Sequence, residues 1–565
     1  MSEGDTMRIV DLAGVGPEAD AKIARLVEAI QSGRINRRQF VSGALASGLS
    51  LAAAVELLTA CGSAAGQPSA TAAAINTAAT VNVAYGEDDW APNGVGVKST
   101  TYMYQLNMNV YEPLIYLAPD YTLKPGLATS WEQTNPTTWR FHLRQGVKWH
   151  DGTAFTADDV NYTWGTRQKQ GATLSTVAST LDHVTKVDDF TIDFITTAPN
   201  YRLAQQIVHP EGAIVQVGKN FDSSPAIGTG PFKVVDYTPS QGAHFQRWDG
   251  YWGQKAQVAA INLRFIPDDQ TRIQALQSGQ VDFIIGVPAL SVAPIKANAT
   301  MRIVEAKQGR NQLIYIDKDG VAPHSIGADP AVRQAVSLGI DRNAYVKTVF
   351  DNNADPGHWM APPFVLGSAA DSVTAPAYNP TKAKQVLDAA GWTVQGDGSR
   401  AKGGTPLALD LIGWAEVTAV AFQFLQSQLG QVGVKINIKQ AADTPTYNNY
   451  YKNTQFDLDL EVPNQNDANP AFLPVLRMYS KNSGTGHYAP GAQFDALAAQ
   501  SFTATSTADV QNLAAQMMQE LINTDYIVVP LAGVRRIFGM KSTINLLDPH
   551  PSLTNQTWLS LVSYK

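Results

Sequence analysis

The feature that most restricts the fold is the alternation of strand-like and helix-like segments along residues 80–565. Alternating apolar residues predict short strands at residues 80–85, 138–143, 190–195, 260–266, 311–317, 406–412 and 434–439. Between several of these strands, apolar residues at helical spacing predict helices at residues 330–339, 381–390 and 419–430. Strands that alternate with helices indicate an α/β architecture, whose ligands bind in a crevice at strand ends or between domains.

Composition restricts the class of protein further. A chain of 565 residues is long enough for two or more domains with large cores. Its 42 Lys and Arg stand against 49 Asp and Glu, and the net charge of -7 argues against a duplex nucleic-acid binder that neutralises phosphates. The single cysteine excludes an intrachain disulfide framework and a multi-cysteine zinc site. We therefore expect no nucleic-acid partner, no metal and no cofactor.

The first 60 residues are typical of an export leader. Residues 41–60 form a weakly apolar run that, as a helix of about 30 Å, is long enough to span a bilayer. Glycines and serines dilute the run and Glu56 adds a charge, so it is a poor membrane anchor. Arg37 and Arg38 precede it in the stretch NRRQFV, which resembles the twin-arginine motif of proteins exported in the folded state.

The apolar run ends in LTAC at residues 58–61, which resembles a bacterial lipobox. In lipoproteins of that kind the cysteine becomes the lipid-modified first residue of the mature chain, so Cys61 is the expected lipid attachment site. Residues 61–79 are small, polar and without periodicity, which predicts a flexible tether. The alternative is a buried cysteine that follows a transmembrane helix.

A series of short blocks after the tether resembles one known family. In chain order the blocks are VYEPL at 110–114, PGLATSW at 125–131, WRFHLRQGVKWHDG at 139–152, TADDV at 156–160, GTGPF at 228–232, DGYW at 249–252, ALQSGQVD at 275–282, VRQAV at 332–336, IDR at 340–342 and AAGW at 389–392. Together they resemble family 5 of the extracytoplasmic solute-binding proteins, the receptors of peptide and nickel type ABC importers.

The resemblance implies a two-lobed periplasmic-binding-protein fold of type II-like topology, with a hinge between the lobes and an extra subdomain. Lobe I would comprise residues 80–310 with the subdomain at about 105–215, lobe II residues 311–525, and residues 526–565 would return to lobe I. The two crossovers are expected near residues 311–317 and 525–531. Such receptors work as monomers in which one lobe binds the ligand and the second closes over it.

Two glycine-rich blocks predict turns. Apolar and polar residues alternate at the start of residues 143–152 and glycines follow, which is typical of a hairpin. The stretch GTGP at 228–231 predicts a turn before a strand. It is not a phosphate loop, because the Lys-Ser/Thr of such a loop does not follow the glycines. The sequence lacks the common hydrolase, zinc-protease and nucleotide-binding motifs. The nearest acid/base pair, His209 and Glu211, is typical of a loop because Pro210 separates them. We therefore expect a binding protein that is not an enzyme.

The ligand site departs from the peptide receptors of this family, in which an Asp four residues before a Pro holds the ligand's α-ammonium group. Here the residue four before Pro470 is Asn466, and Asp467 follows it. Thr444 and Pro463 stand where oligopeptide receptors carry pocket tryptophans, and residues 531–533 are small or aliphatic. These differences favour a roomier and more neutral pocket.

Polar and flat side chains near these positions suit an oligosaccharide or another neutral polar solute, and a peptide remains the alternative ligand. The residues expected to bind it are Trp90, Tyr104, Trp414, Asn464, Asn466 and Asp467. The alternative is that the polar residues of this set form an ordinary loop and that its aromatic residues belong to the core.

The sequence thus predicts a lipid-anchored substrate-binding component of an ABC importer, held on the outer face of the cell membrane or in the periplasm. Its expected partners are the solute, the ABC permease and the membrane through the lipid. The alternative is an exported sensor or structural protein of the same fold that signals to a membrane partner.

Overall fold

The computed structural model divides the chain into two units, Met1–Ala74 and Ile75–Lys565. It describes residues 26, 29, 40, 75–86, 108–170, 177, 180–208, 212–219, 226–318, 326–413, 417–442, 444–453, 456–463, 465, 468–479, 488, 490–546, 549–550 and 559–564. The predicted export motif Arg37 and Arg38 and the predicted lipid site Cys61 lie outside the described residues. No described helix is both long enough and apolar enough to cross a membrane.

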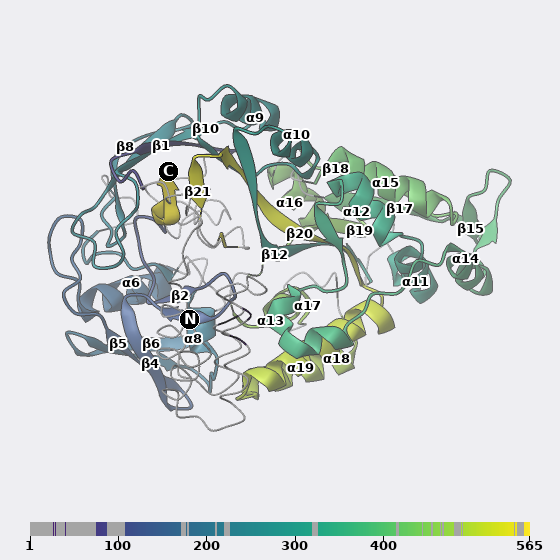
Figure 1. Ribbon diagram of the computed structural model, residues 1–565. Coiled ribbons are helices and arrows are strands. Elements are labelled where there is room, and N and C mark those ends of the chain that lie inside the picture. The colour runs from purple at the N-terminus through teal and green to yellow at the C-terminus, as the bar shows by residue number, and fades with distance from the viewer. Residues whose placement is uncertain are drawn as a thin grey trace. The chain divides into compact units, whose positions relative to one another are not determined.

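A mixed sheet organises the second unit (Figure 1). In the described residues it has 11 strands, with β13 (Ala354–Pro356) paired to β20 beside the main path. The main order is β18 (Lys435–Gln440), β17 (Ala408–Gly413), β19 (Leu458–Glu461), β12 (Met301–Ile316), β20 (Val528–Lys541), β11 (Phe283–Ile285), β1 (Thr80–Tyr85), β10 (Ala260–Phe265), β9 (Gly242–Arg247) and β8 (Phe232–Thr238). Parallel pairs form around β1 and β17, and the long strands β12 and β20 pair antiparallel.

The strands β12 and β20 connect two separate groups of core residues. Residues 301–306 and 537–540 pack with β1, β10 and β11 in a first core group. Residues 313–316 and 528–532 pack with β17, β18 and β19 in a second core group. Between them, residues 307–312 and 533–536 belong to no described apolar cluster. We call these two stretches the polar joint.

A smaller antiparallel sheet forms a third core group. Its order is β4 (Ala128–Asn135), β5 (Thr138–Leu143), β7 (Thr191–Thr196) and β6 (Leu181–Asp188), and α6 (Ala157–Gln170) packs against it. The hairpin β2 (Ile115–Leu117) and β3 (Leu123–Pro125) and the short helix α8 (Leu203–Gln206) contribute to the same core. This group falls in the range where the inserted subdomain is expected.

Helices cover the sheet on either side of the joint. They are α9 (Asp269–Gln277), α10 (Val292–Lys296), α11 (Pro330–Leu338), α12 (Arg342–Phe350), α13 (Pro363–Leu366), α14 (Pro380–Ala389), α15 (Ala419–Gly430), α16 (Thr444–Lys452), α17 (Phe472–Met478), α18 (Ala492–Thr503) and α19 (Thr507–Gln519). Local sequence fixes several starts: the carboxylates of Asp268, Asp329 and Asp341 accept backbone N–H bonds at the N-termini of α9, α11 and α12. Two small sheets complete the described fold: a three-stranded sheet of β14 (Thr393–Val394), β15 (Arg400–Lys402) and β16 (Thr405–Pro406), and a pair of β21 (Ile544–Leu546) and β22 (Val562–Tyr564).

The predicted elements agree with this α/β fold. Residues 80–85, 138–143 and 419–430 have the predicted bounds, and the other predicted strands and helices, with one exception, begin and end within two residues of the observed ones. The exception is the strand predicted at 311–317, which is the second half of β12. The register of β12 against β20 shifts at three places between Glu305 and Leu313. These irregularities interrupt the alternation by which a strand is recognised.

The blocks VYEPL, GTGPF and DGYW meet in the fold. The buried carboxylate of Glu112 accepts hydrogen bonds from Tyr116 Oη at 2.6 Å, Tyr251 Oη at 2.7 Å and Trp252 Nε1 at 2.7 Å. Gly228 lies so close to the Val110 carbonyl that a Cβ would be 1.8 Å from its oxygen. Because β8 begins directly after GTGP, the predicted turn before a strand is confirmed. These blocks therefore serve the packing of the fold.

Candidate ligand-binding site

All six residues predicted from the sequence to bind the ligand, Trp90, Tyr104, Trp414, Asn464, Asn466 and Asp467, lie outside the described residues. His209 and Glu211 lie outside them as well. The segment around the predicted polar cluster is described at residues 456–463, 465 and 468–479, and its neighbours locate it in the fold. We call residues 462–471 the ligand loop.

The polar joint contacts the start of the ligand loop. Arg310 Nη2, from the joint, donates to the Val462 carbonyl oxygen at 2.6 Å. Beside it, the buried Asn311 amide donates to the Met360 carbonyl at 3.0 Å and accepts from Gln308 Nε2 at 2.7 Å. These bonds pair the polar side chains at the point where the sheet passes from the first core group to the second.

The third core group contacts the middle of the ligand loop. Tyr121 Oη donates to the Gln465 carbonyl at 2.9 Å, and the Ala468 N–H donates to the Gln205 carbonyl at 3.4 Å. Within the loop, Gln465 Nε2 donates to the Asn469 carbonyl at 2.8 Å. The described residues of the ligand loop therefore contact the polar joint and the third core group, and Val462 packs against the second.

Buried basic side chains lie near Arg310 and Tyr121. Burial lowers the pKa of Arg536 to about 10, and the charge of Arg310 lowers it further, although Tyr85 opposes these effects. Burial also lowers the pKa of His550 to about 3, with a further decrease from the charge of Arg536. The His550 ring lies 5.4 Å from the ring of Tyr121, centre to centre. At neutral pH His550 is uncharged and Arg536 keeps its charge.

Acidic side chains lie on β19, the strand that leads into the loop. Asp459 is fully buried and Glu461 is 7% exposed. The Tyr447 hydroxyl lies 2.9 Å from Asp459 Oδ2 and 2.5 Å from Glu461 Oε1, and Tyr488 Oη lies 3.0 Å from Asp459 Oδ2. Burial raises the pKa of Tyr488, and the charge of Asp459 raises it further, so this hydroxyl remains a donor. Two buried acidic side chains thus lie on the strand that precedes the loop.

A further contact joins the third and second core groups away from the loop. The buried guanidinium of Arg202 donates to the carbonyl oxygens of Ser501 at 3.3 Å and Ala504 at 2.5 Å, at the end of α18. The Tyr121 ring also lies 4.9 Å from the ring of Phe364, which packs against the third core group. Arg202 therefore contacts α18, whose apolar residues pack in the second core group.

The sequence predictions did not include Arg310, Tyr121, Arg202, Arg536 or His550. Only Arg310 has a recognisable signal, because the polar stretch RNQ at 310–312 interrupts an apolar strand. No group of three or more His, Cys, Asp or Glu residues in the described part of the chain is arranged to hold a metal ion.

Comparisons with known proteins place the chain in a family. Residues 122–486 match the model of the bacterial extracellular solute-binding proteins, family 5, middle part. An ABC transporter peptide-binding protein of Brucella ovis is 30% identical over 354 residues, which cover 60% of this chain and 64% of that protein. The chain thus matches less than two thirds of that relative's length.

Solved structures share the fold. NikA from Brucella suis in complex with Fe(III)-EDTA has a TM-score of 0.76 at 22% identity and covers 86% of this chain and 100% of its own. DppA from Helicobacter pylori in complex with the peptide STSA has a TM-score of 0.71 at 18% identity and covers 86% of this chain and 98% of its own. The two-lobed α/β fold predicted from the sequence is confirmed, and these relatives are binding proteins rather than enzymes. Because the family model matches more than half of its residues, the chain belongs to the bacterial extracellular solute-binding proteins of family 5.

Proposed function

We propose that the protein is the substrate-binding component of an ABC importer, which captures a solute between two lobes and delivers it to the permease. The observation that carries this proposal is the position of the ligand loop, which Arg310 contacts from the joint and Tyr121 from the third core group. A ligand held at that point touches parts that move relative to one another when the lobes close. Its binding energy therefore favours the closed state.

We place the lobes as the sequence suggests: residues 80–310 with a subdomain at about 105–215, residues 311–525, and a return of residues 526–565 to the first lobe. The polar joint lies beside the expected crossovers near 311–317 and 525–531. The division of the core residues on either side of this joint supports two lobes joined by β12 and β20, with residues 528–532 packed in the second core group and residues 537–540 in the first. The protein acts as a monomer in this proposal.

We infer that the solute is polar, either an oligosaccharide or another neutral polar compound, or a peptide. Amide and carboxylate groups in the ligand loop supply donors and acceptors. The peptide alternative is supported by the name of the Brucella ovis relative and by the peptide bound to DppA from Helicobacter pylori.

Native mass spectrometry of the full-length protein, purified without refolding, tests the solute class. A retained sugar or other neutral polar compound supports the neutral pocket, whereas a mixed set of peptide masses selects the peptide alternative. Tyr121→Phe removes the hydroxyl that holds Gln465 and should reduce the retained fraction. Tyr378→Phe, at a tyrosine 38% exposed, is the matched control and should retain the solute as well as the parent does.

The location of the protein is tested separately. We propose that Arg37 and Arg38 direct export and that Cys61 carries a lipid anchor on the outer face of the cell membrane. Cys61→Ala should move the protein from the membrane fraction to the soluble fraction, and the double variant Arg37→Lys and Arg38→Lys should leave precursor in the cytoplasm. Membrane binding that survives Cys61→Ala would remove the lipid anchor from the proposal.

The second candidate function is an exported sensor that signals to a membrane partner. Pull-down from membranes with and without the retained solute distinguishes the two functions. Docking to a permease that depends on the solute supports import, and constitutive docking to another membrane protein supports the sensor.

A further inference from the structure

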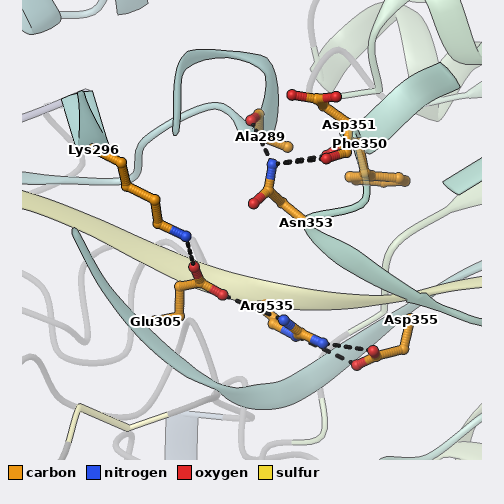
Figure 2. A network of polar contacts seen from close by, with 8 residues as sticks. All are labelled: Ala289, Lys296, Glu305, Phe350, Asp351, Asn353, Asp355 and Arg535. Carbon is orange, nitrogen blue, oxygen red and sulfur yellow. Dashed lines mark hydrogen bonds and ion pairs between the residues drawn. The ribbon is translucent and has the colours of Figure 1, made fainter. Parts of the chain in front are cut away.

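A chain of charged side chains crosses the polar joint (Figure 2). Lys296 Nζ contacts Glu305 Oε1 at 2.8 Å, and Glu305 Oε2 contacts Arg535 Nη1 at 3.3 Å. The same guanidinium binds both oxygens of Asp355, with Nη2 to Oδ1 at 2.5 Å and Nε to Oδ2 at 3.3 Å. Cations and anions alternate along the chain, so each interior member has an opposite charge on either side.

The two ends of this chain belong to different core groups. Lys296 ends α10, whose Val292 and Ile295 pack in the first core group, and Glu305 lies in the adjoining part of β12. Asp355 lies on β13 next to Ala354, which packs in the second core group. Arg535 lies in the polar joint between them. Its ion pairs therefore connect one core group to the other.

Beside the ion pairs, a second contact connects the first core group to the second. The Asn353 side chain donates to the carbonyl oxygen of Ala289 at 3.0 Å, and also lies 3.1 Å from the Phe350 carbonyl and 3.2 Å from the Asp351 carbonyl (Figure 2). Ala289 begins the short helix η2 (Ala289–Ser291), which directly precedes α10 of the first group. Asn353 follows α12, whose Tyr345 and Val346 pack in the second.

The pairing of β12 with β20 is irregular at the joint. Register shifts fall between Glu305 and Gln308, between Gln308 and Arg310, and between Gln312 and Leu313. A bulged ladder bends more readily than a regular one, and the residues around it supply no apolar packing in the described clusters. Side-chain contacts across the joint are therefore needed to fix the angle between the core groups.

We propose that Lys296, Glu305, Asn353, Asp355 and Arg535 form a brace that sets the angle between the two core groups. The brace stabilises the arrangement in which Arg202 contacts α18 of the second group, and it does so whichever solute is bound. Arg535 is its central member, because it alone of the five contacts acids from both groups. The side chains of Arg535 and Asp355 are 31% and 45% exposed, so dissolved salt weakens the brace.

Distance measurement between two spin labels tests the brace without any ligand. The parent is the full-length chain with Cys61→Ala, which removes the only native cysteine, and with Val235→Cys and Val394→Cys for labelling. These valines are 55% and 59% exposed, and they lie on β8 of the first group and on β14 beside the second. The parent should give one narrow distance distribution in low salt and a broader one in about 1 M NaCl, where the screening length is about 3 Å.

Arg535→Gln removes the charge that joins the groups and should broaden the distribution, or add a second maximum, already in low salt, with little further change in high salt. The matched control is Arg140→Gln, which breaks a two-bond Arg–Asp pair with Asp193 inside the third core group and should leave the parent distribution unchanged. Asp355→Asn is a second test of the same bond and replaces Arg535→Gln if that variant fails to fold. A folded variant of either kind that keeps the narrow parent distribution overturns the proposal.

Discussion

At the scale of single residues, burial shifts the pKa of several side chains. Glu112 is fully buried among Tyr116, Tyr251 and Trp252. Burial raises its pKa, and the hydrogen bonds from these three side chains oppose the increase. An acid with a raised pKa stabilises the fold most below its unfolded pKa, and this contribution is lost as the pH rises through the folded value. Three donors around one carboxylate limit that loss.

His150 shows the opposite dependence on pH. Its Nε2 lies 2.9 Å from the Gly230 carbonyl and its Nδ1 accepts from the Gly228 N–H at 3.2 Å, so the neutral ring satisfies both partners. Burial lowers the pKa of His150 from 6.5 to about 4. A lowered pKa means that stability is fully present above pH 6.5 and is lost as the pH falls toward 4, by about 3 kcal/mol in all.

We therefore predict that His150→Asn, whose side-chain oxygen can still accept from Gly228, has a shallower loss of unfolding free energy between pH 6.5 and pH 4 than the parent. Urea unfolding at a series of pH values measures this slope. The pKa values of His358 and His550 are lowered as well, so part of the slope should remain. His183→Asn, at an exposed histidine, is the control, and an equal change of slope in both variants would contradict the assignment.

At the scale of elements, α18 ends in a contact that its own sequence does not supply. Its final carbonyl groups accept from Arg202 of the third core group, a C-terminal cap provided by a distant part of the chain. Burial lowers the pKa of Arg202 to about 10, and the charge of Asp509 opposes this change, so the guanidinium is charged at neutral pH. A cation at a helix C-terminus is also favoured by the helix dipole.

Arg202→Gln should therefore destabilise α18 and loosen its contact with the third core group. Hydrogen bonds to charged groups contribute about 1.5–3 kcal/mol, and this change removes the charge from two of them. Hydrogen exchange should become faster in the last turn of α18, while α15 keeps its protection. Arg247→Gln, which loses a pair with the exposed Asp249, is the control. Unchanged exchange in α18 would mean that the cap has no energetic role.

At the scale of the whole molecule, neither the first nor the second core group is continuous in sequence. The first combines β1 and β10 with residues 537–540 of β20, and the second depends on residues 528–532 of the same strand. One C-terminal strand is therefore central to both groups. We expect the two groups to unfold together rather than as independent domains.

Truncation tests this dependence. A chain that ends at residue 525 lacks β20 and should lose the cooperative thermal transition, because both core groups lose a central strand. A chain that ends at residue 546 keeps β20 and, among the described parts, loses His550, β22 and the η6 turn (Leu559–Leu561), so it should unfold cooperatively at a lower temperature. Circular dichroism on heating distinguishes the two. A cooperative transition in the shorter chain would show that one group folds without β20.

The sequence alone determined the α/β class, the family and most element positions. Periodicity and local signals are sufficient for these: the apolar spacing of residues 419–430 predicts the helix that forms there, and GTGP, rich in turn-forming residues, precedes a strand. The blocks that identify the family are residues that pack against one another, such as Glu112 with Tyr251 and Trp252. Packing of this kind leaves a recognisable pattern along the chain.

Only the tertiary structure decided which distant residues meet. Tyr121 lies beside Gln465, Arg202 at the end of α18, and Arg535 between Glu305 and Asp355. None of these pairs has a local signal, because a surface arginine and one that joins two core groups look the same in a linear sequence. The bulges of β12 also hide the joint, since they break the period by which a strand is recognised. Contacts between core groups depend on how strands cross the sheet, and that crossing is fixed by long-range pairing.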